Sequence, residues 1–380
     1  MTFASMKIAS APQSCASLPM LALSAWFRLR RLAFSRANTG VRRMWAARVG
    51  FYRAMWRSAC EATGVKLAIG RDGEMEMSRD GKSLKARDNE TYVDDPSAVR
   101  RAGDKLLVHR LLTQAGIPTP RYIVATIDEF EQALSFLRSC GSPLVVKPMA
   151  FTGGGCGVTT NVVTEKQLRA AMAWARTFRR KILIEQQIEG DCYRILLLDG
   201  EPLDSIRRRP PTVIGDGKST IRKLLRKENL RRVREGARRS QVMIVTDRDL
   251  VNTLARQSYT LWSRPGAGVV VRLKQIVNEN AIQENEPADS VLCPEIIAAA
   301  RTAAESVGLR LAGVDLICRD PSLPLTTSGG AILEVNARPN LYYHHLEGRE
   351  TLIAEKILTV CLGLRGESRA ALAQNARGGL

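Results

Sequence analysis

Acidic residues are missing from the first sixty positions of the chain, where ten lysines and arginines lie. About half of the net charge of +19 over 380 residues therefore belongs to this segment. A long hydrophobic run is also missing, because the apolar stretch at 18–27 is about half as long as the roughly 20 residues of a membrane span. No small-residue cleavage pattern follows a short basic start, so we do not expect secretion. Three interpretations stay open: a transit peptide, a surface-binding amphipathic segment, or an upstream extension with Met44 as the true start.

Cysteine pairs with metal-ligand spacing are missing too, since none of the eight cysteines forms a Cys-x-x-Cys motif. Without an export signal, this pattern predicts reduced thiols in a cytoplasmic protein. Aromatic residues make up only 5 % of the chain, and few lie among basic charges where they could stack on bases, so we do not expect nucleic acid as a partner. The composition, 45 % hydrophobic and 25 % charged, excludes a disordered chain and favours two or three domains.

The excess of positive charge predicts anionic partners such as nucleotides, phosphates, acidic peptides or a membrane surface. The densest basic stretch, 218–239, holds ten lysines and arginines against two glutamates. A solvated helix face is the simplest interpretation of this stretch. The alternative is a docking surface for an acidic peptide or another polyanion.

Turn residues and hydrophobic periodicity predict helices and strands in mixed order, which is typical of an α/β or α+β protein. Amphipathic spacing and capping residues predict helices at about 42–64, 95–115, 127–140, 219–239, 246–258 and 294–307. Short apolar runs between turn signals predict strands at 65–69, 74–78, 144–147, 181–185, 194–198, 312–318 and 331–336, with one more after the Asp199-Gly200 turn.

Three motif-like sequences do not fit their motifs. Gly217-Lys218-Ser219 lacks the earlier glycine of a P-loop, because Thr212 stands there. The glycine-rich run at 153–157 does not match the dinucleotide motif Gly-x-Gly-x-x-Gly, because the last position is Thr160. His344 and His345 are adjacent, so a strand would point them to opposite faces and they could not readily share a metal ion.

Two lysines and a glycine-rich loop predict phosphate binding. Lys105 lies in the predicted helix at 95–115, and Lys147 ends the apolar strand at 144–147. Five residues after Lys147 the chain enters a loop whose missing side chains let backbone N–H groups close around an anion. Either lysine alone is best interpreted as a solvated charge, whereas a strand-end lysine followed by such a loop favours a phosphate site. The glycines of this loop are Gly153, Gly154, Gly155 and Gly157.

Polar side chains on later strands predict adenine and magnesium binding. The strand at 181–185 leads into a short hinge, whose main chain can pair with an adenine edge while Glu185 accepts from the adenine amino group. Asp315, Glu334 and Asn336 lie on two apolar strands, and the last two share one face. Two carboxylates and an amide oxygen suit magnesium that bridges phosphate oxygens, and a buried salt bridge is the alternative for Asp315.

The order and spacing of these elements resemble the ATP-grasp superfamily, most closely the central ligase domain of cyanophycin synthetases and their relatives. The resemblance runs over about residues 90–360. It is carried by Ala102-Gly103-Asp104-Lys105, Val145-Val146-Lys147-Pro148, the glycine loop, Ile184-Glu185, Ile188-Glu189-Gly190, Arg207-Arg208, Gly215-Asp216-Gly217, Gly313-Val314-Asp315-Leu316 and Glu334-Val335-Asn336-Ala337.

The resemblance implies an α+β ATP-grasp fold in which two subdomains clasp ATP. In such a site Lys105 and Lys147 would hold the nucleotide phosphates, and residues 153–157 would form a flexible loop over them. Adenine would be held by Glu185, Gln186 and Ile188, and Mg²⁺ by Asp315, Glu334 and Asn336. Arg194 and Arg207 or Arg208 would contact phosphate or an acyl phosphate, with Arg272 as a further catalytic candidate.

Two positions depart from the pattern of these relatives. Where these relatives carry a ribose-binding carboxylate, this chain has Cys192. Asp191, one place earlier, is the nearest carboxylate that could contact the nucleotide instead. After Arg272-Leu273 the chain has Asn278-Glu279-Asn280 where the cyanophycin enzymes have a Ser/Thr-Gly-Gly segment. Because this region faces the substrate, we expect a different substrate.

The resemblance also divides the chain into regions. Residues 1–43 would be a basic leader-like or disordered segment, and 44–117 an N-terminal helix with a reduced region before the ATP-grasp domain. Residues 118–190 would form the lid subdomain. Residues 191–362 would form the C-terminal subdomain with the metal site and a basic helical insertion at 218–239, followed by a flexible tail at 363–380.

The implied reaction is ATP-dependent ligation of a carboxylate to an amine. ATP would phosphorylate the carboxylate, and the amine would attack the acyl phosphate to form an amide, with magnesium and cationic side chains neutralising the moving charge. The expected substrate is an amino acid or an acidic peptide, and a homo-oligomer is left open. Two alternatives are an ATP-grasp kinase and a nucleotide-responsive protein that binds an acidic partner without catalysis.

Overall fold

A computed structural model of the chain describes residues 20–25, 27–28, 39–149, 155–236, 239–345 and 352–364. Within these ranges, none of the helices combines the length and the apolar character that crossing a membrane requires. The described elements are helices and mainly antiparallel sheets, as expected for an α+β protein. The predicted region boundaries stay predictions.

The N-terminal part consists of a long helix and a small meander. Helix α2 (Thr39–Thr63) confirms the predicted helix, and it packs against the last helix, α11 (Leu352–Leu362). The meander contains β1 (Lys66–Ile69), β2 (Met75–Arg79), β3 (Lys82–Arg87) and β4 (Glu90–Thr91). Asp80 and Gly81 both take positive φ in the β2–β3 turn, as a tight hairpin turn requires. The first two strands were predicted from the sequence, and the other two were not.

The predicted helix at 95–115 is two helices. Helix α3 (Pro96–Gly103) begins after its N-cap Asp95, and α4 (Lys105–Gln114) begins after Asp104. Asp104 has extended backbone, and its side chain accepts hydrogen bonds from the N–H groups of Leu106 and Leu107. This second cap breaks the helix and places Lys105 at the first position of α4.

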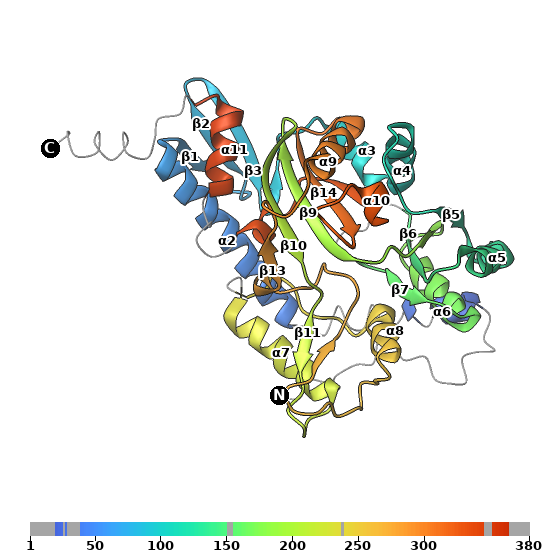
Figure 1. Cartoon of the computed structure of the whole chain (residues 1–380). Coiled ribbons are helices and arrows are strands. Elements are labelled where there is room, and N and C mark those ends of the chain that lie inside the picture. The colour runs from blue at the N-terminus through green and yellow to red at the C-terminus, as the bar shows by residue number, and fades with distance from the viewer. Residues whose placement is uncertain are drawn as a thin grey trace.

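A five-stranded antiparallel sheet forms the centre of the molecule, in the order β13-β10-β9-β14-β15 (Figure 1). Its strands are β9 (Asp191–Leu198), β10 (Glu201–Arg208), β13 (Asn285–Pro287), β14 (Leu311–Cys318) and β15 (Ala331–Ala337). Alternate residues of β9 face two cores: Ile195 and Leu197 pack with α9 (Pro294–Val307), whereas Leu196 and Leu198 pack with residues of α2 and α11. The sheet therefore has a helix layer on each face.

A second four-stranded sheet, here called the lid sheet, has the order β5-β8-β6-β7. Its strands are β5 (Tyr122–Ala125), β6 (Leu144–Pro148), β7 (Thr159–Val162) and β8 (Ile182–Gln186), and its helices are η2 (Ile127–Glu129), α5 (Phe130–Cys140) and α6 (Glu165–Arg176). These elements lie on the right of Figure 1, across the molecule from α2 and α11. Leu23 and Phe27 are buried against α6, where the Phe27 ring lies 5.5 Å from that of Trp174.

The remaining elements lie below the central sheet in Figure 1 or connect its strands. A two-stranded ribbon packs with two helices around a small apolar core that includes Val213, Leu224 and Val271. These elements are β11 (Thr212–Ile214), α7 (Ile221–Glu235), α8 (Arg248–Arg256) and β12 (Val270–Arg272). The short connecting helices are η4 (Ile282–Glu284), α10 (Leu325–Ser328) and η5 (Leu341–His344).

Candidate functional site

A cavity of about 1080 Å³ is lined by residues of the lid sheet, the central sheet and α2. Eleven of the predicted site residues line this cavity, although together they span more than two hundred residues of the sequence. They are Lys105, Lys147, Gly155, Glu185, Gln186, Ile188, Arg194, Arg208, Asp315, Glu334 and Asn336. The fold therefore gathers most of the predicted site in one place.

Lys147 and Glu185 form the buried centre of the lid side. The two residues lie on the neighbouring strands β6 and β8, and Lys147 Nζ is 2.6 Å from Glu185 Oε2. The other carboxylate oxygen is 2.6 Å from Nε2 of His109, which lies on α4. Burial alone would raise the pKa of the Glu185 carboxyl, but Lys147 and His109 lower it to about 2. The buried carboxylate thus stays ionised and holds Lys147 in place.

Lys105 connects the lid side to the central sheet. Its ammonium forms an ion pair with the carboxylate of Glu334 on β15. Burial, together with the repulsion of Lys147, lowers the pKa of the Lys105 amine to about 7. The two lysines therefore meet at one place in the cavity wall, as a polyphosphate site requires.

Asp315 is held by two neighbouring strands. It lies opposite Arg194 of β9 and opposite Glu334 of β15 in the sheet register. Arg194 donates two hydrogen bonds to the Asp315 carboxylate, at 2.7 and 2.5 Å, and Asn336 donates a third at 3.0 Å. Although burial opposes it, Arg194 lowers the pKa of the Asp315 carboxyl. Asp315 therefore forms the buried salt bridge that the sequence analysis gave as the alternative to metal binding. It also lies next to Glu334 and Asn336, the other two predicted metal ligands.

Arg208 is a fully buried cation in the same cavity. Its Nη2 donates to the carbonyl of Val277 at 3.1 Å, and its guanidinium lies 4.5 Å from the ring centroid of Tyr343. Its Nε and Nη1 are buried and have no hydrogen-bond partner among the described residues. Burial and the nearby Arg194 lower the pKa of this guanidinium. Nη1 lies 3.7 Å from Asp315 Oδ1 in an ion pair that is too long for a hydrogen bond. Buried guanidinium donors without a hydrogen bond beside a cavity suit an anionic ligand.

The donor set at β14 and β15 fits a magnesium ion. Asp315 and Glu334 are cross-strand neighbours, and Asn336 turns its amide nitrogen to Asp315, which leaves its amide oxygen to a cation. All three are hard oxygen ligands, which magnesium prefers together with phosphate oxygens and water. In the described part of the chain, no group of three or more His, Cys, Asp or Glu side chains could hold a metal ion. Asn336 and a bound phosphate would therefore complete the coordination.

Four predicted site residues lie away from the cavity walls. Arg207 and Asp191 form an ion pair with each other at 2.5 Å, on the opposite face of the central sheet from Arg208. Arg272 is exposed on β12 and donates to Gln275 at 3.3 Å. The fourth is Gly157. Its positive φ and its close approach to Phe178 and Pro148 explain why a glycine is needed at this position without a role in ligand binding. None of these four residues lines the large cavity, and the catalytic or nucleotide-binding roles predicted for them stay predictions.

The glycine loop is described only in part. Gly153 and Gly154 lie outside the described residues. At Gly155, φ is +72°, and a Cβ atom would lie 2.9 Å from Ile276 and 3.1 Å from Asn278. This end of the loop therefore touches the segment after β12 that lines the same cavity.

Several cavity residues were not predicted from the sequence. Among them are Arg48 of α2 and Tyr343 of η5, whose hydroxyl donates to the carbonyl of Asn278 at 2.9 Å. Nothing in their local sequence marks these residues, because tertiary packing alone brings them to the cavity. His109 did have a signal: it lies four residues after Lys105 and thus on the same face of a helix.

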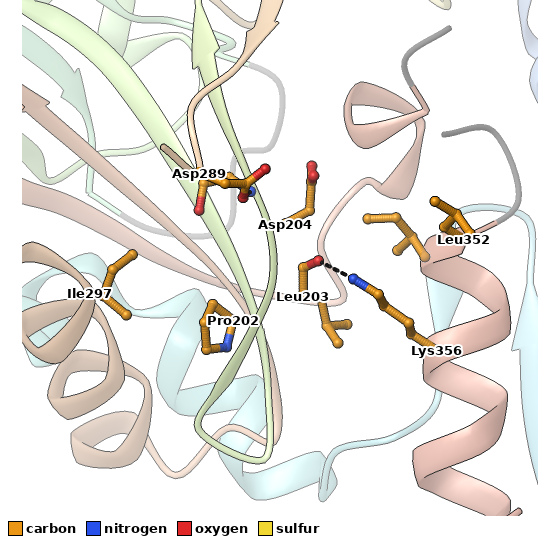
Figure 2. A pocket seen from close by; sticks show the side chains of 9 residues that line it. Pro202, Leu203, Asp204, Asp289, Ile297, Leu352 and Lys356 are labelled. Carbon is orange, nitrogen blue, oxygen red and sulfur yellow. Dashed lines mark hydrogen bonds between the residues drawn. The ribbon is translucent and has the colours of Figure 1, made fainter. Parts of the chain in front are cut away.

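A smaller cavity of about 500 Å³ lies between β10, α9 and α11 and contains none of the predicted site residues (Figure 2). Lys356 reaches across it to donate to the carbonyl of Leu203 at 2.9 Å. Asp204, on its wall, accepts from Nδ1 of the buried His344 at 2.7 Å. These contacts join α11 and η5 to the edge of the central sheet.

Comparison with known proteins identifies the class of this fold. Residues 111–209 match the family model described as the D-ala D-ala ligase C-terminus. A crystal structure of a bifunctional glutathione synthetase from Pasteurella multocida aligns with a TM-score of 0.51 at 19 % identity, over 79 % of this chain and 41 % of that one. The chain has the ATP-grasp fold, and its sequence is similar to that of ATP-grasp ligases.

Curated proteins that are similar to this chain in sequence include cyanophycin synthetases. The enzyme of Trichormus variabilis is 32 % identical over 248 residues, which are 65 % of this chain and 27 % of that protein. The Synechocystis enzyme is 33 % identical over 254 residues, 65 % of this chain and 28 % of that protein. The glutathione biosynthesis bifunctional protein of Streptococcus mutans is 27 % identical over 277 residues, 71 % of this chain and 36 % of that protein. The chain thus spans little more than a quarter of the length of the cyanophycin synthetases.

Proposed function

We propose that the protein is an ATP-dependent carboxylate–amine ligase, which forms an amide bond through an acyl phosphate and releases ADP and phosphate. The observation that carries this proposal is the single cavity that joins two lysines, two buried arginines and the Asp315, Glu334 and Asn336 set. The named relatives, a synthetase and a glutathione biosynthesis protein, support the same class of reaction. The substrate would be an amino acid or an acidic peptide.

ATP would lie between the lid sheet and the central sheet. Lys105 and Lys147 would contact its phosphates, and the segment 185–188 would contact adenine through its main chain, Gln186 and Ile188. Glu185 already accepts from both Lys147 and His109, so it would also act by orienting Lys147 towards the phosphates. Cys192 lines the cavity where the relatives carry a ribose-binding carboxylate, so ribose would be held in another way.

Asp315, Glu334 and Asn336 would hold Mg²⁺, which supplies charge neutralisation at the transferred phosphoryl group when it is bound. Arg194 would keep Asp315 ionised and oriented for this task. Arg208 would stabilise the negative charge of the acyl phosphate through the guanidinium donors that form no hydrogen bond within the described part of the chain. Gly155, at the described end of the glycine loop, would help to exclude water, which would otherwise hydrolyse that intermediate.

The test is product analysis with purified protein, ATP and Mg²⁺ over pooled amino acids and acidic peptides. We expect substrate-dependent release of ADP and phosphate, and a product lighter by one water than its two substrates. A Glu334→Gln variant should lose turnover by about 100-fold or more, because it removes one magnesium ligand. AMP and pyrophosphate would refute the acyl-phosphate route, and a stable phosphoester formed without an amine would identify a kinase instead.

A further inference from the structure

A fully buried lysine and three buried carboxylates lie together behind one wall of the large cavity. Lys274 Nζ is 2.7 Å from Asp247 Oδ2 and 2.9 Å from Glu279 Oε2. Although burial opposes it, these two carboxylates raise the pKa of the Lys274 amine. The third carboxylate, Asp249, accepts hydrogen bonds only from N–H and hydroxyl groups within the described part of the chain. These four residues are here called the Lys274 cluster, and the proposed reaction so far gives them no role.

The Lys274 cluster holds more negative than positive charge. Its three carboxylates face Lys274 and one further cation, Arg248, which interacts with Asp247. Lys274 donates a hydrogen bond to Asp247, so the lysine keeps a counter-ion even without the charge of Glu279. When all three carboxyl groups are ionised, one negative charge is left over. A buried charge of this kind is costly unless a proton or another cation balances it.

Glu279 is the member of the Lys274 cluster that lines the large cavity. Its Oε2 faces Lys274 and accepts from the N–H of Val245 at 2.8 Å. Its other oxygen, Oε1, is open to the cavity and accepts no hydrogen bond within the described part of the chain. Burial raises the pKa of the Glu279 carboxyl to about 7, against the effect of Lys274 and together with that of Asp247. A carboxylate that exchanges its proton near neutral pH is suited to act as a general base.

One turn places Glu279 beside the proposed acyl-phosphate site. The N–H of Asn280 donates to the carbonyl of Val277 at 3.3 Å, which closes a turn with Glu279 inside it. The same carbonyl accepts from Nη2 of Arg208 at 3.1 Å. Because the residues of such a turn lie within about 7 Å of one another, the backbone of Glu279 is within roughly 10 Å of the Arg208 guanidinium. One bound substrate can span this distance.

The wall beside Glu279 carries a second polar group without a partner. Gln241 also lines the cavity and is 7 % exposed, and its amide oxygen and nitrogen are buried without a hydrogen bond within the described residues. Arg232 joins the two segments, since its Nη1 donates to the carbonyls of Glu279 at 2.6 Å and of Val242 at 3.3 Å. Because nearly all buried polar groups in folded proteins form hydrogen bonds, this amide indicates that a ligand completes the wall.

We propose that Glu279 binds the amine substrate through its ammonium group and takes up the proton that this group must lose before it attacks the acyl phosphate. The inference rests on the proposed function and adds a catalytic residue to it. The ammonium group supplies the positive charge that the Lys274 cluster lacks. The amine substrate is then an alkylamine, such as the amino group of an amino acid, which is charged at neutral pH.

The proton passes from the ammonium nitrogen to Oε1 of Glu279 and frees the lone pair of that nitrogen. The lone pair forms the C–N bond while the C–O bond to phosphate breaks. Phosphate departs with the electrons of the broken bond and takes the second N–H proton. Glu279 afterwards returns its proton to water.

The test compares two kinds of amine, with ATP, Mg²⁺ and the pooled amino acids and acidic peptides. Hydroxylamine is uncharged at neutral pH and traps acyl phosphates as hydroxamates, so it needs no general base. Glu279→Gln should lower amide formation by about 100-fold and hydroxamate formation by less than about threefold. The loss of amide formation should shrink as the pH rises, because free amine then forms without Glu279.

Glu284→Gln is the matched control. Glu284 is a largely buried glutamate of the same region that also accepts from backbone N–H groups, those of Thr212 and Ala281. It does not line the large cavity. This variant should form both products as the unchanged protein does.

Equal losses of amide and hydroxamate in Glu279→Gln would overturn the inference, because Glu279 would then act on ATP, on the carboxylate or on the fold. Undiminished amide formation in this variant would overturn it as well. If the unchanged protein forms neither product, the ligase proposal is refuted, and this inference with it. Hydroxamate formation by the unchanged protein keeps the ligase proposal, whichever way the Glu279 variant behaves.

Discussion

At the scale of single residues, the two adjacent arginines of β10 lie in different surroundings. Arg208 is buried in the wall of the large cavity near Asp315, whereas Arg207 is 35 % exposed and pairs with Asp191 on the other face. Sequence spacing could not choose between them, because one of two successive strand residues must face each way. In the folded sheet, the side chain of Arg208 faces the cavity and that of Arg207 faces away from it.

The two arginines offer a matched test. Replacing Arg208 by Lys should lower ADP release by about 100-fold, because one amine cannot reproduce the geometry of the guanidinium donors. Arg207→Lys should keep turnover within about twofold, since exposed ion pairs contribute little. Equal loss in the two variants would contradict the assignment, and thermal unfolding of both shows whether each is folded.

His344, which lies away from the large cavity, is expected to make the stability of the protein depend on pH. It is fully buried and bonded to Asp204, and its burial lowers the pKa of the imidazole below its usual value. The unfolded chain therefore binds the proton more readily, and stability rises as pH increases through the usual pKa of histidine.

We therefore expect the free energy of unfolding to fall from about pH 7 to pH 5. The fall should be smaller in His344→Asn than in His345→Asn, which changes the neighbouring and less buried histidine. Urea unfolding of the three proteins at both pH values measures this difference. Parallel pH dependence of all three would show that His344 does not titrate on unfolding.

At the scale of elements, α8 ties the lid sheet to the loop after β12. One oxygen of the buried Asp249 accepts from Thr160 of β7, through both its N–H and its hydroxyl. The other accepts from the N–H groups of Gln275 and Ile276, at 3.1 and 3.3 Å. Farther along α8, Asn252 donates to the carbonyl of Thr160 at 3.0 Å. A single carboxylate thus links two walls of the cavity.

Asp249→Asn should lower the free energy of unfolding by about 1–3 kcal/mol, because an amide cannot accept from all these donors. Asp216→Asn removes an exposed carboxylate that also accepts two N–H groups, and it should cost less than about 1 kcal/mol. Chemical denaturation compares the two variants. A loss no larger for Asp249→Asn than for Asp216→Asn would show that α8 does not fix the lid sheet.

At the scale of the whole molecule, two described segments of the N-terminal region pack into the fold. Tyr52 and Trp56 of α2 are buried in the core shared with α11, and Arg48 of α2 lines the large cavity. Farther towards the N-terminus, Leu23 and Phe27 are buried against α6 of the lid sheet. A chain beginning at Met44 would keep the first set of contacts and lose the second.

Phe27→Ala should therefore destabilise the full-length chain by about 3 kcal/mol, the usual cost of removing a buried phenylalanine. Leu21→Ala, at a position 62 % exposed, should change stability by less than about 0.5 kcal/mol. Urea unfolding measures both. No difference between the two variants would mean that residues 20–28 contribute nothing to the folded protein.

The sequence by itself determined the fold class and the core of the candidate site. Local signals sufficed wherever one segment carries the whole pattern: the apolar strand that ends at Lys147, the shared face of Glu334 and Asn336 on one apolar strand, and the helices marked by their caps. The order of these segments also predicted the ATP-grasp fold and the resemblance to cyanophycin synthetases, and the comparisons confirm both.

Only the tertiary structure decided what depends on contacts between distant segments. It broke the helix at Asp104, assigned opposite faces to Arg207 and Arg208, and brought His109 to Glu185 and Arg48 to the cavity. The physical reason is that strand register and helix packing set which side chains meet, and both depend on burial across the whole chain rather than on the local sequence.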